Sequence, residues 1–476
     1  MQLSAITRRL FPSSEAILAL MPFAEAAGGD LPLPRLARLS LFQISVGMAL
    51  VLLNGTLNRV MVLEMGQAAW LVSLMVSLPL LFAPMRALIG FRSDHHRSLL
   101  GWRRVPFIWG GSMIQFGGLA IMPFALIVLA DPSAGPTWLG PAAAALAFLL
   151  VGAGLHVTQT AGLALATDLA TDKTRPKVVA LLYVMLLVGT IGSALLFSWL
   201  LSEFNYLKLI KVIQGAAVAT IVLNCIALWR QESLQPSKTD PARPRPAFSE
   251  SWAAFSRNRS TRRLLLAIGL GTAGFSMQDI LLEPYGGEVL GMSVSSTTLL
   301  SAIWGFGMLV AFAFSSRRLD RGADPIRMAG YGSVLGLFAF AAVILAAPFG
   351  SPLLFMVGAC LIGLGGGFFA VGTLIAAMGL GNDEEKGLAL GAWGAVQATA
   401  AGLAIAAGGA LRDFTTHLAV SGRLGPALMD PVTGYSTVYH IEVLLLFAAL
   451  IALGPLVRGP RQERDAQPFA LPDFPT

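Results

Sequence analysis

The composition of this chain excludes an ordinary soluble protein. Of its 476 residues, 55% are hydrophobic and only 12% are charged, whereas soluble domains average about 25% charged residues. We therefore expect lipid to cover much of the surface. In such a protein the location of the positive charge matters more than the net value of +7, and we expect no nucleic-acid partner.

Twelve apolar segments follow one another along the chain, each long enough to cross ~30 Å of hydrocarbon as a helix. Alternation with a period of two residues is absent, which favours helices over a barrel. Residues 1–37, before the first segment, are expected to form an amphipathic cytoplasmic segment. The predicted spans cover about 39–60, 68–90, 105–130, 139–166, 177–201, 207–229, 264–290, 296–315, 327–348, 352–380, 387–411 and 437–457.

A proline-rich and basic stretch, residues 231–262, divides the spans into two sets of six. It predicts a linker between a bundle at 38–230 and a bundle at 263–457, with a tail at 458–476. Of the 33 lysines and arginines, five fall on the side opposite the linker and both termini. The positive-inside rule then places the linker and both termini in the cytoplasm. The five are Arg59, Lys208, Lys211, Arg412 and Arg423.

Charged turns recur at equivalent places in the two sets. "GFRSDHHRSLLGWRR" follows the second span, and the shorter "SSRRLDRGADPIR" follows the eighth. This arrangement is similar to the major facilitator superfamily, in which two six-helix bundles enclose a cavity near the midplane. We expect the charged side chains of these turns to pair with helix ends and to hold the bundles together on the inner side. They are Asp94, Arg97, Arg103, Arg104, Asp320 and Arg321.

Ionisable and amide side chains inside the spans are costly and are therefore candidates for function. His156 lies near the middle of the fourth span, with Gln159 on the same face and Gly152 and Gly154 just before it. One hypothesis makes His156 a ligand to the magnesium of a chlorin, with space for it beside the glycines. The alternative is a packed histidine with an interhelical hydrogen bond, its glycines serving helix contact.

Aromatic side chains beside glycines form a second candidate feature. Phe368 and Trp393 lie in "GLGGGFFA" and "GAWGA". They could stack on a planar ligand together with His156 and Gln159, although most such neighbours pack helices. No residue cluster predicts a metal site of the protein's own, and His95 and His96 are expected to face solvent and headgroups.

The first and seventh spans carry further polar residues. Asp279 and Glu283 are four residues apart and so share a helix face, Gln278 is adjacent, and we expect Pro284, Gly286 and Gly287 to break that helix. These side chains, with Asn54, predict a polar cavity lining or a proton-coupling site. A salt bridge or helix cap between the bundles is the alternative. Arg59 and Glu64, at the outer end of the first span, are expected to form a structural ion pair.

Longer stretches resemble one particular family. They are "LSLFQISVGMALVLLNGTLNRVMVLEMG", "APMRALIGFRSDHHRSLLGWRRVPFIW", "HVTQTAGLALATDLA" and "MQDILLEPYGGEVLGM". These resemble the PucC/LhaA family, the bacteriochlorophyll-delivery members of the major facilitator superfamily in photosynthetic bacteria. The likeness runs from about Leu31 to Leu456.

The resemblance implies an assembly factor for light-harvesting antenna in the bacterial inner photosynthetic membrane. It would hand bacteriochlorophyll to antenna polypeptides, the core antenna being favoured over the peripheral one. Pigment-synthesis or membrane-insertion machinery is a further expected partner. Catalytic motifs such as a nucleotide loop or HExxH are missing, so we expect no enzyme. The alternatives are a proton-coupled transporter of a small solute and a scaffold that binds no pigment.

Overall fold

The computed structural model describes residues 32–81, 89, 102, 104–131, 136–170, 175–232, 257–319, 321–378 and 386–457. Within these ranges every regular element is helical, and no strand is formed. A helix satisfies its own backbone hydrogen bonds, which a lipid-exposed chain requires. The predicted all-α fold class is therefore confirmed.

The first set of helices is built from the N-terminal half of the chain. Helix α4 (Leu41–Leu50) continues through two π-helical segments, η2 (Val51–Leu57) and η3 (Val60–Glu64), so the first span is wound more loosely in its second half. The other helices of this set are α3 (Leu33–Leu39), α5 (Ala69–Leu81), α7 (Val105–Ala130), α8 (Leu139–Leu169), α9 (Arg175–Leu200) and α10 (Tyr206–Leu228).

The second set begins after the linker. Its seventh span is not continuous, because α12 (Arg259–Ser276) is followed by the 3-10 turn η5 (Met277–Ile280) and by α13 (Leu282–Glu288). The remaining helices are α14 (Val294–Leu319), α15 (Pro325–Ala346), α16 (Pro352–Met378), α17 (Lys386–Val420) and α18 (Val432–Leu453), with short 3-10 turns η6 (Pro426–Leu428) and η7 (Gly454–Leu456).

The predicted spans correspond to these helices. In the described ranges ten helices are long and apolar enough to cross a membrane, and the bent seventh span makes up to eleven. The second predicted span appears as the shorter apolar helix α5, and residues 82–88 after it lie outside the described ranges. The eleventh span was predicted to end at 411 but extends to Val420.

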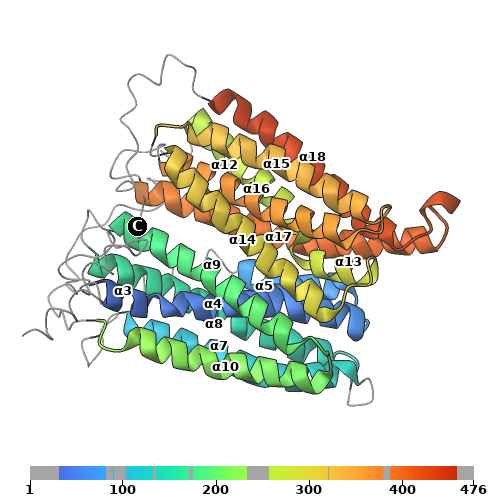
Figure 1. Cartoon of the computed structure of the whole chain (residues 1–476), viewed down its shortest axis with the longest axis horizontal. Coiled ribbons are helices and arrows are strands. Elements are labelled where there is room, and N and C mark those ends of the chain that lie inside the picture. The colour runs from blue at the N-terminus through green and yellow to red at the C-terminus, as the bar shows by residue number, and fades with distance from the viewer. Residues whose placement is uncertain are drawn as a thin grey trace, which may run out of the picture.

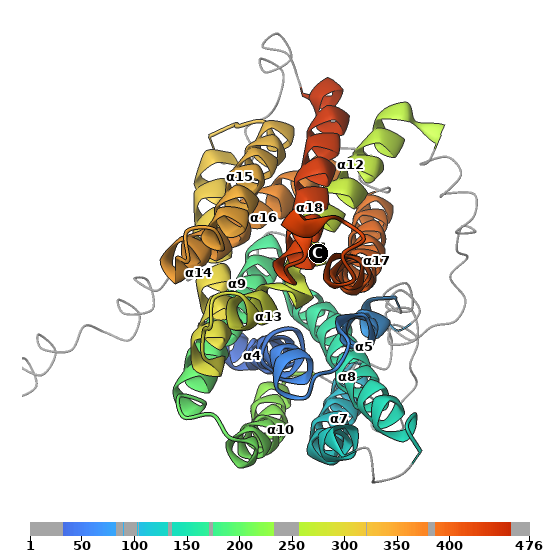
Figure 2. The ribbon, with the colours of Figure 1, turned by 90° about the vertical axis from the view of Figure 1, so that its right-hand side faces the viewer.

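Two bundles are visible in Figure 1 and Figure 2, one blue to green and one yellow to red. Helix α14 packs on α9, and α17 packs on α5, so these two pairs join the first bundle to the second. Helix α3 begins, α10 ends and α12 begins at the left of Figure 1. We call this the linker end and the opposite one the far end.

Glycines allow neighbouring helices to approach closely. A Cβ atom at Gly118 of α7 would lie 2.6 Å from the backbone nitrogen of Val151 in α8. One at Gly307 of α14 would lie 2.2 Å from the backbone oxygen of Cys360 in α16. Both contacts are backbone to backbone, as is common where helices associate in lipid.

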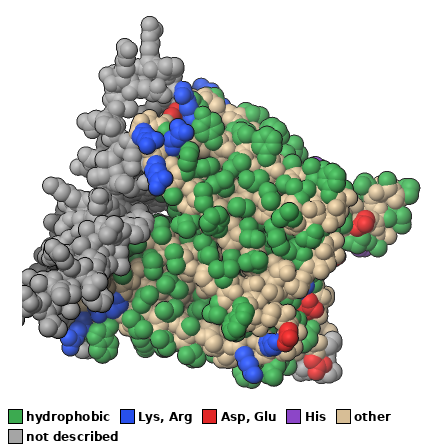
Figure 3. All heavy atoms as spheres, in the orientation of Figure 1, with side chains coloured by type: hydrophobic (Ala, Val, Ile, Leu, Met, Phe, Trp, Pro, Cys, Tyr) green, Lys and Arg blue, Asp and Glu red, His purple; other side chains and the backbone are tan. Residues whose placement is uncertain are grey.

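The outer surface suits a hydrocarbon environment. Figure 3 shows hydrophobic side chains spread over the middle of one face, with charged side chains toward its edges. Large apolar side chains on this exterior include Trp199 and Leu353, each 71% exposed. Water would penalise such a surface, whereas lipid accommodates it.

Candidate functional site

The break in the seventh span is stabilised by side chains from two other helices. Asn58 of the first span donates through Nδ2 to the backbone oxygen of Ile280, at 2.6 Å. The backbone N–H of Gln278 donates to a carboxylate oxygen of Glu442 in α18, at 2.7 Å. Backbone groups freed by a helix break in lipid need such partners. The break therefore depends on contacts from both bundles.

Two carboxyl groups lie deeply buried around this break. Glu442 is 0% exposed and Glu283 is 3% exposed. One oxygen of Glu283 accepts a hydrogen bond from Ser301 Oγ, at 2.9 Å. Its second oxygen, and the second oxygen of Glu442, meet no hydrogen-bond donor among the described residues. Because a buried charge is costly, such carboxyl groups are suited to hold a proton.

Glu283 also lies directly against the first bundle. A Cβ atom on Gly55 would be 2.2 Å from Glu283 Oε1, so the carboxyl group occupies the space that a larger residue would need. Gly55 belongs to the π-helical segment η2. The loosened first span and the broken seventh span thus meet at one point between the bundles.

Two details of the seventh span were predicted wrongly. The break lies at Met277–Ile280, one turn before Pro284, because proline is accepted in the first turn of α13. Asp279 and Glu283 therefore do not share a continuous helix. Asp279 instead accepts a hydrogen bond from Gln278 Nε2 at 2.6 Å.

The predicted ion pair between Arg59 and Glu64 is present. Arg59 also donates to the backbone oxygen of Met292, at 3.4 Å, and so reaches the second bundle. Asn54, predicted to line the cavity, is half-buried, and its backbone oxygen accepts a hydrogen bond from Asn58 Nδ2.

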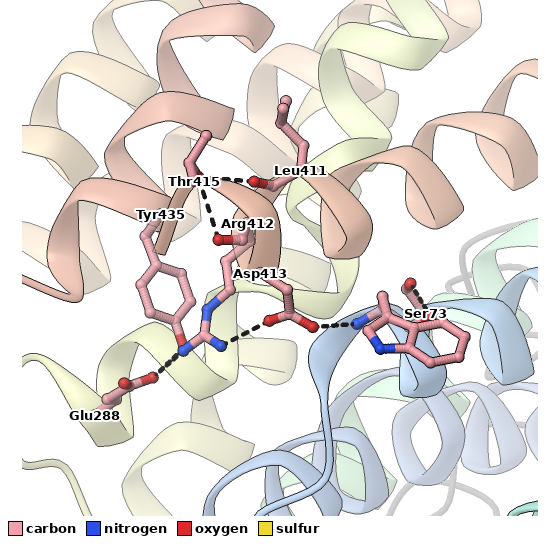
Figure 4. Close-up of polar contacts among 8 residues, drawn as sticks. Ser73, Glu288, Leu411, Arg412, Asp413, Thr415 and Tyr435 are labelled. Atoms are coloured by element: carbon pink, nitrogen blue, oxygen red, sulfur yellow. Dashed lines mark hydrogen bonds and ion pairs between the residues drawn. The ribbon is translucent and has the colours of Figure 1, made fainter. Parts of the chain in front are cut away.

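A second polar cluster lies at the far end, where Arg412 is in the centre of Figure 4. Its guanidinium contacts Glu288 and the hydroxyl of Tyr435, and it donates to Asp413 Oδ1 at 2.9 Å. Asp413 Oδ2 accepts a hydrogen bond from the backbone N–H of Trp70, at 2.8 Å. The cluster thus fixes α17 to α13, to α18 and to α5 of the first bundle.

The hydrogen bonds that join the two bundles within the described residues all lie in the half of the molecule toward the far end. Besides those of Asn58, Arg59 and Trp70, they join Thr56 to Thr298, Ser73 to Ala406, and Ser198 to Ser295. The bundles are therefore held together at the far end.

The contacts of Gly152 and Gly154, just before His156, show whether these glycines leave space for a ligand or allow close helix contact. A Cβ atom at Gly152 would lie 2.2 Å from the ring of Pro79 in α5, and one at Gly154 would lie 2.3 Å from the backbone of Gln115 in α7. The glycines therefore serve helix contact and leave no ligand space there. His156 itself is half-buried. Because it is about 200° around the helix from Gly154, it points away from the contact with α7.

The other three predicted pigment residues have neighbours in different places. Gln159 donates to Gln43 of α4, at 3.5 Å. Phe368 packs edge-on against Phe314, with ring centres 5.7 Å apart. Trp393 donates through its indole nitrogen to Thr373, at 3.2 Å. None of these contacts joins one predicted pigment residue to another, and their shared pocket stays a prediction.

Comparison with known proteins identifies the family. The family model described as PUCC protein matches residues 56–460. The chain belongs to the PucC family. It is 58% identical over 399 residues to Protein PucC of Rhodovulum sulfidophilum, covering 83% of this chain and 88% of that one. It is 52% identical to an uncharacterized protein in the puhA-bchM intergenic region of Rhodobacter capsulatus, covering 99% and 100% of the two chains.

Solved structures identify the fold of this PucC-family protein. A bacterial homologue of the human lysosomal transporter Spinster matches with a TM-score of 0.66 at 14% sequence identity, covering 88% of this chain and 95% of that one. At such identity the likeness concerns the fold alone. The predicted all-α membrane fold, with its helices arranged in two bundles, is confirmed, and it is the fold that this transporter shares.

The charged turns of this PucC-family chain are described only in part. Arg104 is buried and donates to Asp168 Oδ2 at the end of α8, at 3.1 Å. Arg321 is exposed in the turn before α15. Asp94, Arg97, Arg103 and Asp320 lie outside the described residues, so their predicted pairings stay predictions.

Sequence reasoning missed Glu442, the most deeply buried carboxyl group at the break. It lies in "YHIEVLLLF", where a single acidic residue interrupts an apolar run. The same argument from insertion cost that selected His156 would have selected it. It also missed the Arg412 cluster, because the eleventh span was ended just before that residue.

Proposed function

We propose that this chain is a non-enzymatic assembly factor for bacterial light-harvesting antenna that binds bacteriochlorophyll and delivers it to antenna polypeptides. The core antenna is the favoured recipient over the peripheral one. The protein would act in the inner photosynthetic membrane, with both termini and the linker in the cytoplasm. The observation that carries the proposal is the PucC-family match over residues 56–460.

The chemistry of the cargo suits a half-buried imidazole inside the membrane. Bacteriochlorophyll is apolar, so it requires an apolar surface, and its magnesium accepts a neutral nitrogen ligand. His156 offers that nitrogen from α8, on the side turned away from α7. Pro79 and Gln115 occupy the space beside the glycines that precede His156. The macrocycle would therefore bind at another side of the imidazole. Transfer to another histidine would be nearly balanced in free energy, which favours delivery over trapping.

The test is co-purification from a bacterium that makes the pigment. The full chain is extracted in mild detergent, and pigment absorbance is measured per mole of protein, beside a transporter of the same fold from another family. We expect pigment well above that control, together with antenna polypeptides. Antenna polypeptides without pigment would support the scaffold alternative and contradict delivery.

A second candidate function rests on the buried carboxyl groups. Glu283 and Glu442 lie at a broken helix between the bundles, and each has an oxygen without a donor among the described residues. Charged or polar groups nearby are Arg59, Asp279, Ser301 and Tyr439. Such groups could bind and release protons as the bundles move, which is the requirement of a proton-coupled transporter of a small solute.

Proton flux into liposomes distinguishes this candidate from pigment delivery. A pyranine assay on reconstituted protein would show a solute-dependent proton flux if the transporter function is present. Glu442→Gln keeps an oxygen to accept the hydrogen bond from Gln278 but loses the exchangeable proton, so it would abolish the flux while preserving the fold. Delivery without transport predicts no flux in either protein.

A further inference from the structure

One face of α18 carries three buried polar side chains in a row. Tyr435, Tyr439 and Glu442, here called the α18 column, are each 0% exposed. They are four and three residues apart, so they lie one after another on the same side of the helix. At ~1.5 Å per residue the α18 column spans about 10 Å, from the far end to the break in the seventh span. Buried ionisable groups in a membrane are costly, and chains of them relay protons in pumps and transporters.

The outer end of the α18 column reaches the surface at the far end. The hydroxyl of Tyr435 donates to Glu288 Oε2, at 2.5 Å, and Figure 4 shows the two side chains together. The Glu288 side chain is 30% exposed. The same hydroxyl accepts a hydrogen bond from Arg412, at 3.0 Å, and a hydroxyl oxygen can accept a second one. A partly exposed carboxylate is therefore one hydrogen bond away from the first member of the α18 column.

The inner end of the α18 column lies at the break. Glu442 Oε1 accepts the hydrogen bond from the backbone N–H of Gln278. The second oxygen of Glu442 and the hydroxyl of Tyr439 are buried and lack a hydrogen-bond partner among the described residues. The carboxyl group interacts electrostatically with that hydroxyl and with Asp279, and no lysine or arginine in the described ranges is among the groups that act on it. A buried carboxyl group without a cation beside it is suited to hold a proton.

Tyr439 is held between these two ends by neighbouring rings. Its ring stacks on Phe340, with ring centres 6.2 Å apart, and meets Tyr285 edge-on, with centres 5.5 Å apart. Its hydroxyl therefore has a fixed position, close enough to the hydroxyl of Tyr435 for the two to interact electrostatically. Buried polar atoms of this kind typically bind ordered water. Because a hydroxyl can donate and accept at once, it can take up a proton on one side while it gives its own proton to the other.

We propose that the α18 column, with water between its members, is a proton path that connects Glu442 at the break to Glu288 at the far end. When the O–H bond of Glu442 breaks, a new O–H bond forms at the next oxygen, and so on until Tyr435 passes a proton to Glu288. The hydroxyls end with the protons they began with, so the net change is one proton moved. The titratable groups that face the α18 column are Asp279, Tyr285, Glu288 and Arg412.

The path deepens the second candidate function, on which it rests for what the proton would drive. A proton-coupled transporter needs a buried proton-binding group that can reach the solution on one side of the membrane. The α18 column gives Glu442 that access at the far end, and proton exchange through it requires no transported solute.

Hydrogen–deuterium exchange of the Glu442 carboxyl group tests the path. The full chain is reconstituted in lipid, and infrared difference spectra follow the C=O stretch of protonated carboxyl groups after transfer to heavy water. The band that Glu442→Gln lacks is assigned to Glu442. We expect Tyr439→Phe and Tyr435→Phe to slow the exchange of this band by roughly tenfold, the effect on a rate of one lost hydrogen bond.

Tyr285→Phe is the matched control. Tyr285 belongs to the same aromatic cluster and is 1% exposed, but its hydroxyl donates to the backbone oxygen of Val343 in α15, at 3.2 Å. We expect this variant to exchange at the wild-type rate. The Tm of each variant identifies folded protein, and the two path variants are separate substitutions, so a folding defect in one leaves the other to decide.

An unchanged exchange rate in a folded path variant, or equal slowing in Tyr285→Phe, would overturn the proposal. So would a wild-type band that does not exchange, or identical carboxyl bands in wild type and Glu442→Gln, since Glu442 would then hold no exchangeable proton. Solute-driven flux is measured separately. Its absence beside slowed exchange in the path variants would reject the transporter function alone, whereas a normal flux beside unchanged exchange would reject the path alone.

Discussion

The side-chain amide of Asn58 donates a hydrogen bond to the backbone carbonyl of Ile280, at 2.6 Å, and so joins the first span to the break in the seventh. Asn58 is fully buried. Since the carbonyl belongs to one bundle and the amide to the other, separation of the bundles at the far end would leave a backbone group without its partner. The break in the seventh span is therefore stabilised by the contact between the bundles at the far end, and opening that end would destabilise the break.

Asn58→Ala is expected to weaken this closure. Removing one partner of a buried hydrogen bond costs about 1–3 kcal/mol. We expect a lower Tm in detergent and a larger labelling rate for a cysteine placed at Thr298, which faces Thr56 across the same contact. Asn54→Ala is the control, because only the backbone of Asn54 takes part in the neighbouring bond. Equal behaviour of the two variants would contradict the coupling.

The Arg412 cluster should be important for stability. Removing one partner of a buried ion pair costs about 3–5 kcal/mol, and the 30% exposure of the Glu288 side chain places the cost toward the lower end. We expect Arg412→Ala to lower the Tm and the yield of monodisperse protein. Arg423→Ala removes an exposed arginine near the same end and should leave both unchanged. An equally stable Arg412→Ala protein would show that the cluster is dispensable.

Much of this architecture could be predicted from the sequence, because lipid imposes simple rules. Apolar runs of sufficient length located the helices, and the pair of Arg59 and Glu64 followed from local spacing. The same rules placed the end of the eleventh span too early, because they assign a charged residue to the outside of the membrane. In the structure α17 continues through Arg412, whose charge is compensated by Asp413 and by Glu288 of α13.

What the sequence could not reveal were contacts between distant segments. The break at Met277–Ile280 depends on Asn58 and Glu442, which are far away along the chain. The π-helical turns of the first span have no sequence pattern that separates them from an α-helix. The glycines before His156 illustrate the same limit, because small residues favour both a ligand and a neighbouring helix until the neighbour is known.

The orientation across the membrane that the lysines and arginines predict can be measured directly. With Cys225 and Cys360 replaced by alanine, Arg245→Cys in the linker should resist an impermeant maleimide in spheroplasts and react after lysis. Ser421→Cys, in the exposed turn at the far end, should react in intact spheroplasts. Reaction of the linker cysteine before lysis would overturn the cytoplasmic placement of the linker.

The central claim is that His156 holds the magnesium of bacteriochlorophyll, and one ratio tests it most directly. Pigment absorbance per mole of folded, purified protein is compared for wild type, His156→Leu and His440→Leu. His440 is the control, because it is an exposed histidine on α18 that bonds its own helix at Ser436. We expect His156→Leu to remain folded and to lose its pigment, while His440→Leu keeps the wild-type ratio. An unchanged ratio in His156→Leu, with lower protein abundance, would show that His156 is a packing residue and would contradict the claim.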